Sequence, residues 1–161
     1  MLFILISCGV PLLIAIGLSR IVRTSVGAHE AKYRMLLYAA CVAFFVSWYL
    51  PSPRIDGQDT SFMTHVLGGG IFTGLLWLYL KKSFTWRAHW SIEVFSLFAL
   101  VSALGCVNEL AELFMVRLHI ATILLSDTNW DILANTLGAL VLFIAYSIIN
   151  NLNSTSRDRR R

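Results

Sequence analysis

The strongest constraint on the fold of this chain is a series of five long apolar runs separated by polar or charged segments. A helix needs about 20 apolar residues to cross the hydrocarbon core of a bilayer, where its backbone groups must be hydrogen-bonded internally. Hydrophobic residues make up 57% of the 161 residues and charged residues only 14%, which excludes an ordinary soluble domain. The runs therefore predict an all-α integral membrane bundle of five transmembrane helices. The predicted helices are Met1 to Leu18, Met35 to Leu50, Phe62 to Leu80, Ile92 to Met115 and Ile132 to Ile149.

The sequence predicts one membrane domain followed by a short polar tail. We expect residues 1–150 to form a single transmembrane helical domain and residues 151–161 to form a basic, disordered cytoplasmic tail. The first apolar run is unlike a signal peptide, because no basic residue precedes it and Arg20 and Arg23 follow directly behind it. We therefore expect this run to stay in the mature protein.

Basic residues gather at one end of the predicted helices. Eleven of the 13 Lys and Arg residues follow the first, third or last run; they are Arg20, Arg23, Lys32, Arg34, Lys81, Lys82, Arg87, Arg157, Arg159, Arg160 and Arg161. Cytoplasmic loops carry an excess of such residues, so the N-terminus is predicted outside and the C-terminus in the cytoplasm of a multi-pass inner (plasma) membrane protein. These cations can meet anionic headgroups, so membrane lipids are the expected partners and nucleic acid is not. No feature of the sequence indicates an oligomeric state.

Acidic residues gather at the opposite end. Six of the nine Asp and Glu residues lie there; they are Asp56, Asp59, Glu109, Glu112, Asp127 and Asp131. Carboxylates on one side of a membrane repel one another unless a cation, protons or hydrogen-bond donors offset the repulsion. The distribution predicts a polar site on the extracytoplasmic side.

The strongest single signal is a polar group near the outer end of the fourth predicted helix. Asn108, Glu109 and Glu112 interrupt an apolar sequence, and spacings of three and four residues put Glu112 on one face with the other two. A carboxylate at the bilayer centre costs on the order of 2.5 to 3.5 kcal/mol on insertion scales, and less near the interface. The pair is a candidate functional site; alternatively, the helix ends earlier and both glutamates are solvated.

A second polar group opens the fifth predicted helix. Thr128 and Asp131 match a helix capping box, which accounts for these two residues without any further function. Capping does not account for Asn135, which lies one turn deeper on the same face as Asp131. Capping and a functional role both remain open for this segment.

His65 lies one turn inside the third predicted helix, just before glycines at 68–70 and 74. A lone histidine in a membrane helix is often only an interhelical hydrogen-bonding contact, and the glycine pattern is typical of close helix packing. Because His65 projects from the same outer level as the carboxylates, we favour a functional role for it.

An imidazole and several carboxylates from three helices suit a divalent cation such as Mg²⁺, Mn²⁺, Ca²⁺ or Zn²⁺. We predict Glu109, Glu112, Asp127 and Asp131 as metal ligands, with His65, Glu109 and Glu112 in catalytic roles. The predicted substrate-binding residues are Asp59, Asn108 and Asn135. Alternatively, protons or the cations of Arg54 and Arg117 pair with the carboxylates.

Three sequence features occur in a characteristic order: His65 before a glycine-rich helix, the segment Asn108 to Glu112, and the segment Asp127 to Asp131 followed by Asn135. In these features the chain resembles the YjdF-like and VanZ-like bacterial membrane proteins over roughly its last three helices. The resemblance implies a bundle of about five or six helices with polar residues near one surface, and a place in the cell envelope. It is closer to the YjdF-like proteins, because VanZ-like proteins carry an Asp-Lys pair four residues before the histidine, where this chain has Ser61.

Three classes of function are consistent with these features. The leading one is a polar site that binds a cation or a phosphate-bearing lipid headgroup, with metal-assisted hydrolysis or transfer as the chemistry if the protein is an enzyme. The alternatives are a lipid flippase or transporter, and a non-catalytic membrane scaffold subunit.

Overall fold

The computed structural model describes residues 2–55, 58–119 and 128–158, and within these ranges the chain is almost entirely helical. The elements are α1 (Leu2–Val26), η1 (Gly27–Tyr33), α2 (Arg34–Ser47), β1 (Arg54–Ile55), β2 (Gln58–Asp59), α3 (Phe62–Thr64), η2 (His65–Ile71), α4 (Phe72–Ser83), α5 (Trp90–Arg117) and α6 (Thr128–Asp158). The two strands, of two residues each, pair in an antiparallel hairpin in which Arg54 lies opposite Asp59.

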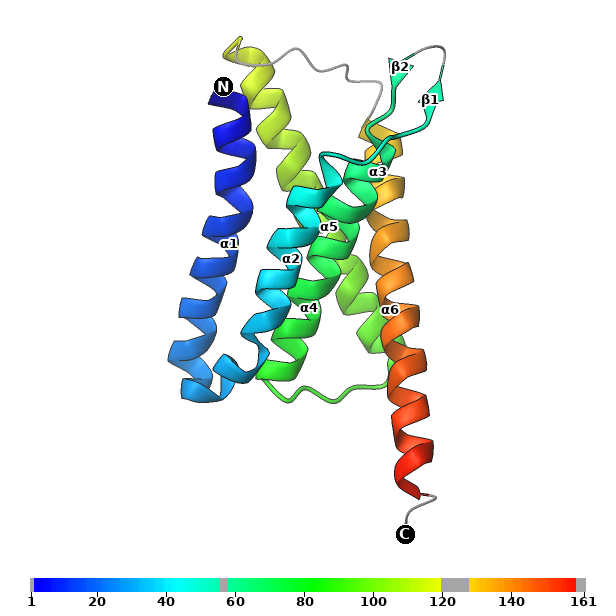
Figure 1. Ribbon diagram of the computed structural model, residues 1–161. Coiled ribbons are helices and arrows are strands. Elements are labelled where there is room, and N and C mark those ends of the chain that lie inside the picture. The colour runs from blue at the N-terminus through cyan, green and yellow to red at the C-terminus, as the bar shows by residue number, and fades with distance from the viewer. Residues whose placement is uncertain (1, 56–57, 120–127, 159–161) are drawn as a thin grey trace.

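The segments α3, η2 and α4 form one continuous span, and this span, α1, α2, α5 and α6 run in alternating directions through one bundle (Figure 1). Four described stretches are long and apolar enough to cross a membrane: Gly9–Ser47, Phe62–Ser83, Trp90–Arg117 and Asn129–Asn150. The first stretch folds back on itself at η1, so that α1 and α2 lie antiparallel. The β1–β2 hairpin lies at the same end of the bundle as the start of α6, and η1 lies at the other end.

The predicted all-helical class is confirmed, and two helices continue eight or more residues beyond their predicted C-terminal ends. α1 continues past Leu18 to Val26 and stops where Gly27 adopts a φ of +65°, a conformation that favours glycine and commonly ends helices. α6 continues to Asp158, into the segment predicted as a disordered tail. No proline or glycine follows Asn150, so nothing in the sequence breaks the helix there.

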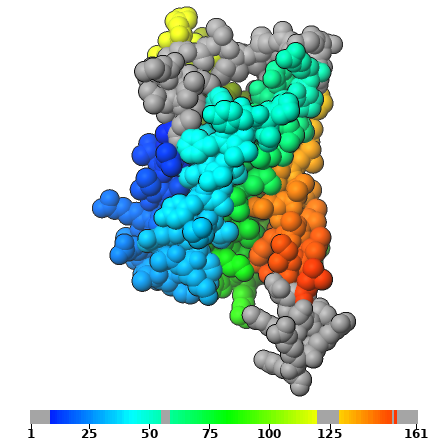
Figure 2. Space-filling view, in the orientation of Figure 1, coloured from blue at the N-terminus to red at the C-terminus, as the bar shows by residue number. Residues whose placement is uncertain are grey.

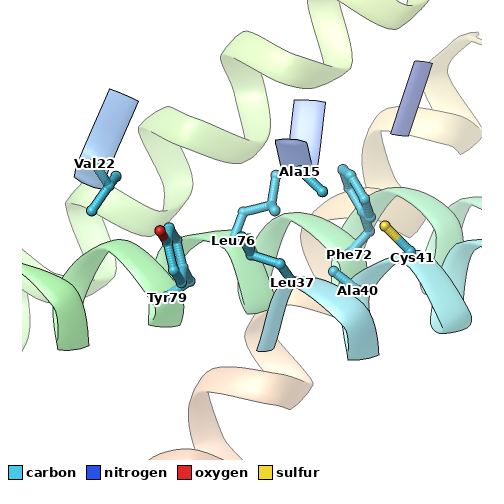
Figure 3. Close-up of a cluster of buried hydrophobic side chains, with 8 residues drawn as sticks. All are labelled: Ala15, Val22, Leu37, Ala40, Cys41, Phe72, Leu76 and Tyr79. Carbon is cyan, nitrogen blue, oxygen red and sulfur yellow. The ribbon is translucent and has the colours of Figure 1, made fainter. Parts of the chain in front are cut away.

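Two apolar clusters hold the bundle together. The first joins α1, α2 and α4; its buried residues are Ala15, Val22, Leu37, Ala40, Cys41, Phe72, Leu76 and Tyr79 (Figure 3). The second joins α4, α5 and α6 around Trp77, Val101 and Phe143. Many apolar side chains remain exposed, such as Leu13 at 70% and Phe95 at 70%, as expected for helices that face lipid. On the face shown in Figure 2, α2 lies in front of α4, between α1 and α6.

The segment η2 is a π-helical turn that packs very closely against α6. A Cβ atom placed on Gly70 would lie 2.4 Å from the backbone oxygen of Asn135, and one on Gly138 would lie 2.1 Å from the backbone oxygen of Val66. Only residues without a side chain permit such an approach. The glycine-rich sequence therefore serves helix packing here, and it brings His65 next to the start of α6.

A buried carboxylate stabilises the other end of the bundle. Glu30 in η1 is 0% exposed; it accepts hydrogen bonds from the Arg34 guanidinium and, at 3.0 Å, from the Tyr79 hydroxyl. Nearby, Lys81 of α4 forms an ion pair with Glu93 of α5. Glu30 and Glu93 thus each have a cationic partner. The sequence did not identify Glu30, because an acid in a loop rich in basic residues resembles a solvated one.

Candidate functional site

The two glutamates of α5 lie on the same face of the helix as its buried residues, farther toward the C-terminal end. Leu97, Val101 and Gly105 are the buried positions of α5 and recur every four residues. The next position in this series is Glu109, and Glu112 follows on the same side. One face of α5 therefore packs against other helices in the N-terminal half and carries the two glutamates in the C-terminal half.

Three of the predicted acidic residues converge. One carboxylate oxygen from each of Glu109, Glu112 and Asp131 lies within 4.8 Å of the others, which joins α5 to α6. Asp131 is 3% exposed, and both glutamates are half-buried. The Glu109 Oε1 atom is inaccessible to solvent and has no hydrogen-bond partner among the described residues. We refer to these three residues as the acidic cluster.

His65 extends the acidic cluster onto a third helical segment. Its Nε2 atom lies 3.2 Å from Oδ1 of Asp131, and its side chain is only 14% exposed. His65 is the first residue of the π-helical turn, and turns of this kind occur often at functional sites. The structure thus brings Asp131 to an imidazole and two carboxylates, an environment that helix capping alone does not require.

Asn135 lies one turn deeper than Asp131 and is 4% exposed. Its side chain occupies the space left by two glycines: a Cβ on Gly69 would lie 1.7 Å from Oδ1, and a Cβ on Gly105 would lie 3.6 Å from Nδ2. The carboxamide interacts with the imidazole of His65. Its Oδ1 atom is buried and has no hydrogen-bond partner other than this imidazole among the described residues.

The other predicted residues lie outside the acidic cluster. Asn108 is exposed, but its Nδ2 atom donates a hydrogen bond of 2.7 Å to Oε1 of Glu112, which orients that carboxylate. Asp59 is exposed in β2 and accepts a hydrogen bond from the Ser61 backbone, so its observed role is to shape the turn before α3. Asp127, a predicted metal ligand, lies outside the described residues. Arg54 and Arg117, the suggested cationic partners, are both exposed.

The donor atoms of this site favour one class of cation. Three carboxylates match the oxygen ligand sets of Mg²⁺, Mn²⁺ and Ca²⁺, whereas Zn²⁺ sites in proteins use histidine and cysteine more often. Neither of the two cysteine side chains that the structure describes contributes here, since Cys41 is buried against α1 and Cys106 is exposed on α5. His65 and Glu109 are side chains at this site whose chemistry allows them to accept a proton.

Comparison of the chain with family models, with curated proteins and with solved structures gives no match. The resemblance to the YjdF-like and VanZ-like proteins therefore stays a prediction that rests on the three sequence features alone.

Proposed function

We propose that this is a five-span inner-membrane protein that binds a divalent cation at the acidic cluster and, through the cation, the phosphate of a lipid headgroup. The observation that carries the proposal is the convergence of three carboxylates from two helices to within 4.8 Å. The N-terminus and the acidic cluster face out, and the basic loops and C-terminus face the cytoplasm.

Electrostatics supports the cation. Like charges a few ångströms apart in a partly buried site cost free energy that a bound divalent cation or a proton must offset. Glu109 Oε1 is a buried oxygen without a hydrogen-bond partner among the described residues, and coordination to a metal ion would satisfy it.

The surroundings of the site support a lipid as the substrate. Val107, Leu110 and Phe114 flank the two glutamates on α5 and are each more than 60% exposed. A lipid in the outer leaflet can therefore lie against α5 while its phosphate reaches the cation. Apolar clusters fill the bundle farther along its axis, which favours a site open to one side over a transport path.

The reaction that fits the acidic cluster and His65 is hydrolysis of a phosphate ester. The cation would bind a phosphate oxygen and lower the pKa of a bound water, as divalent metals do in hydrolases. His65 would accept a proton from that water, with its ring held by Asp131. The water oxygen would bond to phosphorus as the ester bond breaks, and His65 would return the proton to the departing alcohol oxygen. Asn108 would orient Glu112, and Asn135 would contact the headgroup.

Thermal unfolding of the purified protein tests the cation site. Mg²⁺, Mn²⁺, Ca²⁺ or Zn²⁺ at 100 times its dissociation constant should stabilise the wild type by about 2.7 kcal/mol. Glu109→Gln and Glu112→Gln should lose this increment. Without cation they should unfold at the same temperature as the wild type or higher, because one of three mutually repelling charges is gone.

Glu93→Gln provides the matched control, since it makes the same change on the same helix at the end where Glu93 pairs with Lys81. It should lower the melting temperature while keeping the cation increment. Equal increments in wild type and both cluster variants would exclude a cation at these residues. If cations bind but labelled phospholipid in vesicles releases no headgroup, the binding proposal stands and the hydrolytic one does not.

A further inference from the structure

The structure has an apolar groove at the end of the bundle opposite to the acidic cluster, between the end of α4 and the start of α5. Its volume is about 350 Å³, and its lining includes Leu80, Phe84, Trp86 and Leu100. The indole N–H of Trp77, which also lines the groove, donates a hydrogen bond of 2.9 Å to Ser96. The groove therefore presents an almost wholly apolar wall to a ligand.

The entrance of the groove carries aromatic side chains and positive charge. Phe84 is 47% exposed and Trp86 is 37% exposed, as is common for aromatic residues at the boundary between lipid and water. The charge of Lys81 is balanced by Glu93. Lys82 contacts the ring of Tyr146, and Arg87, adjacent to Trp86 in the chain, is exposed. No described residue forms an ion pair with Lys82 or Arg87, so a net positive charge remains beside the groove.

From this combination we infer that the groove binds one anionic phospholipid, with an acyl chain along its apolar wall and the phosphate beside Lys82 and Arg87. The charge of the rim selects the occupant, because basic sites between membrane helices bind anionic headgroups. A zwitterionic lipid would fill the same groove without gaining from these cations. The site lies away from the acidic cluster and does not depend on the function proposed there.

Electron spin resonance of the full chain in phosphatidylcholine vesicles measures this selectivity. Spin-labelled phosphatidylglycerol and spin-labelled phosphatidylcholine are compared for the fraction immobilised by the protein. The wild type should prefer phosphatidylglycerol, and each lost charge should weaken that preference about fivefold, so Lys82→Gln with Arg87→Gln should remove most of it. Arg20→Gln with Arg23→Gln, which removes two exposed charges from α1 at the same end, should retain most of it.

A second variant separates the groove from general surface charge. Leu100→Trp fills the groove, whereas Leu13→Trp adds the same bulk on α1 at a side chain that is 70% exposed and outside the groove. Only Leu100→Trp should release phosphatidylglycerol, and circular dichroism confirms that both variants keep their helices. Retention of the preference by Leu100→Trp would show that surface charge alone holds the lipid and would overturn the inference. Equal immobilisation of both lipids by the wild type would overturn it as well.

Discussion

His65 and Asp131 belong to segments 66 residues apart in the chain, yet Nε2 of the imidazole lies 3.2 Å from Oδ1 of the carboxylate. Close packing of η2 on α6 makes this contact possible, because glycines on both segments let the two backbones approach. Asp131 also belongs to the acidic cluster, so one carboxylate connects the imidazole to the two glutamates.

The contact predicts energetic coupling between His65 and Asp131. In a double-mutant cycle on unfolding in detergent, His65→Ala and Asp131→Asn should couple by about 0.5 to 3 kcal/mol, the range for residues in direct contact. His65→Ala combined with Asp59→Asn serves as the control, because Asp59 is exposed and bonded to its own turn. Additive effects for His65 and Asp131 would show that the contact contributes nothing to stability.

Asn108 should influence cation binding although it is exposed. Its hydrogen bond to Glu112 orients a proposed ligand, and loss of such a second-layer partner usually weakens metal affinity about 10- to 100-fold. Asn108→Ala should therefore raise the cation concentration needed for half-maximal stabilisation by about this factor. Asn129→Ala, another exposed asparagine at the same end, should leave that concentration unchanged.

Substitution by alanine should lower the stability of the protein at Gly138 in α6 but keep or raise it at Gly17 in α1. A Cβ at Gly138 would collide with the Val66 backbone, and overpacking of this kind typically costs about 1 to 3 kcal/mol. Gly17 in α1 has open space around its Cβ position, so Gly17→Ala should keep or raise stability through its higher helix propensity. Thermal unfolding of the two variants measures both effects, and equal melting temperatures would contradict the observed packing.

The Tyr79 hydroxyl should stabilise the basic end of the bundle. Tyr79 is 0% exposed and donates to the buried carboxylate of Glu30, and a hydrogen bond to a charged group is worth about 1.5 to 3 kcal/mol. Tyr79→Phe should lower the free energy of unfolding by this amount. Tyr49→Phe, at a side chain 87% exposed, should change it by less than about 0.5 kcal/mol.

The proposed orientation predicts which loops are accessible from outside the cell. In a background where Cys8, Cys41 and Cys106 are replaced by Ala, a membrane-impermeant maleimide should label Asp59→Cys in intact cells. Arg87→Cys, which is also at an exposed position, should react only after permeabilisation. The reverse labelling pattern would place the acidic cluster on the cytoplasmic side and contradict the proposal.

The apolar runs by themselves determined the helical class, because a backbone in lipid has to satisfy its hydrogen bonds within each helix. The spacing of Glu109 and Glu112 likewise placed both on one face of α5, since the helical period is fixed by backbone geometry. The positions of the glycines indicated close packing of the third helix. These conclusions need only local rules.

Only the tertiary structure decided which of these side chains meet. The rotation and crossing of α5, η2 and α6 bring Glu109, Glu112, Asp131 and His65 together but leave Asp59 exposed, and no local periodicity fixes such angles. The π-helical turn at His65 and the burial of Glu30 also depend on neighbouring helices. Burial and ligand geometry arise from contacts between segments far apart in the chain, whereas a sequence pattern reports the environment along a single segment.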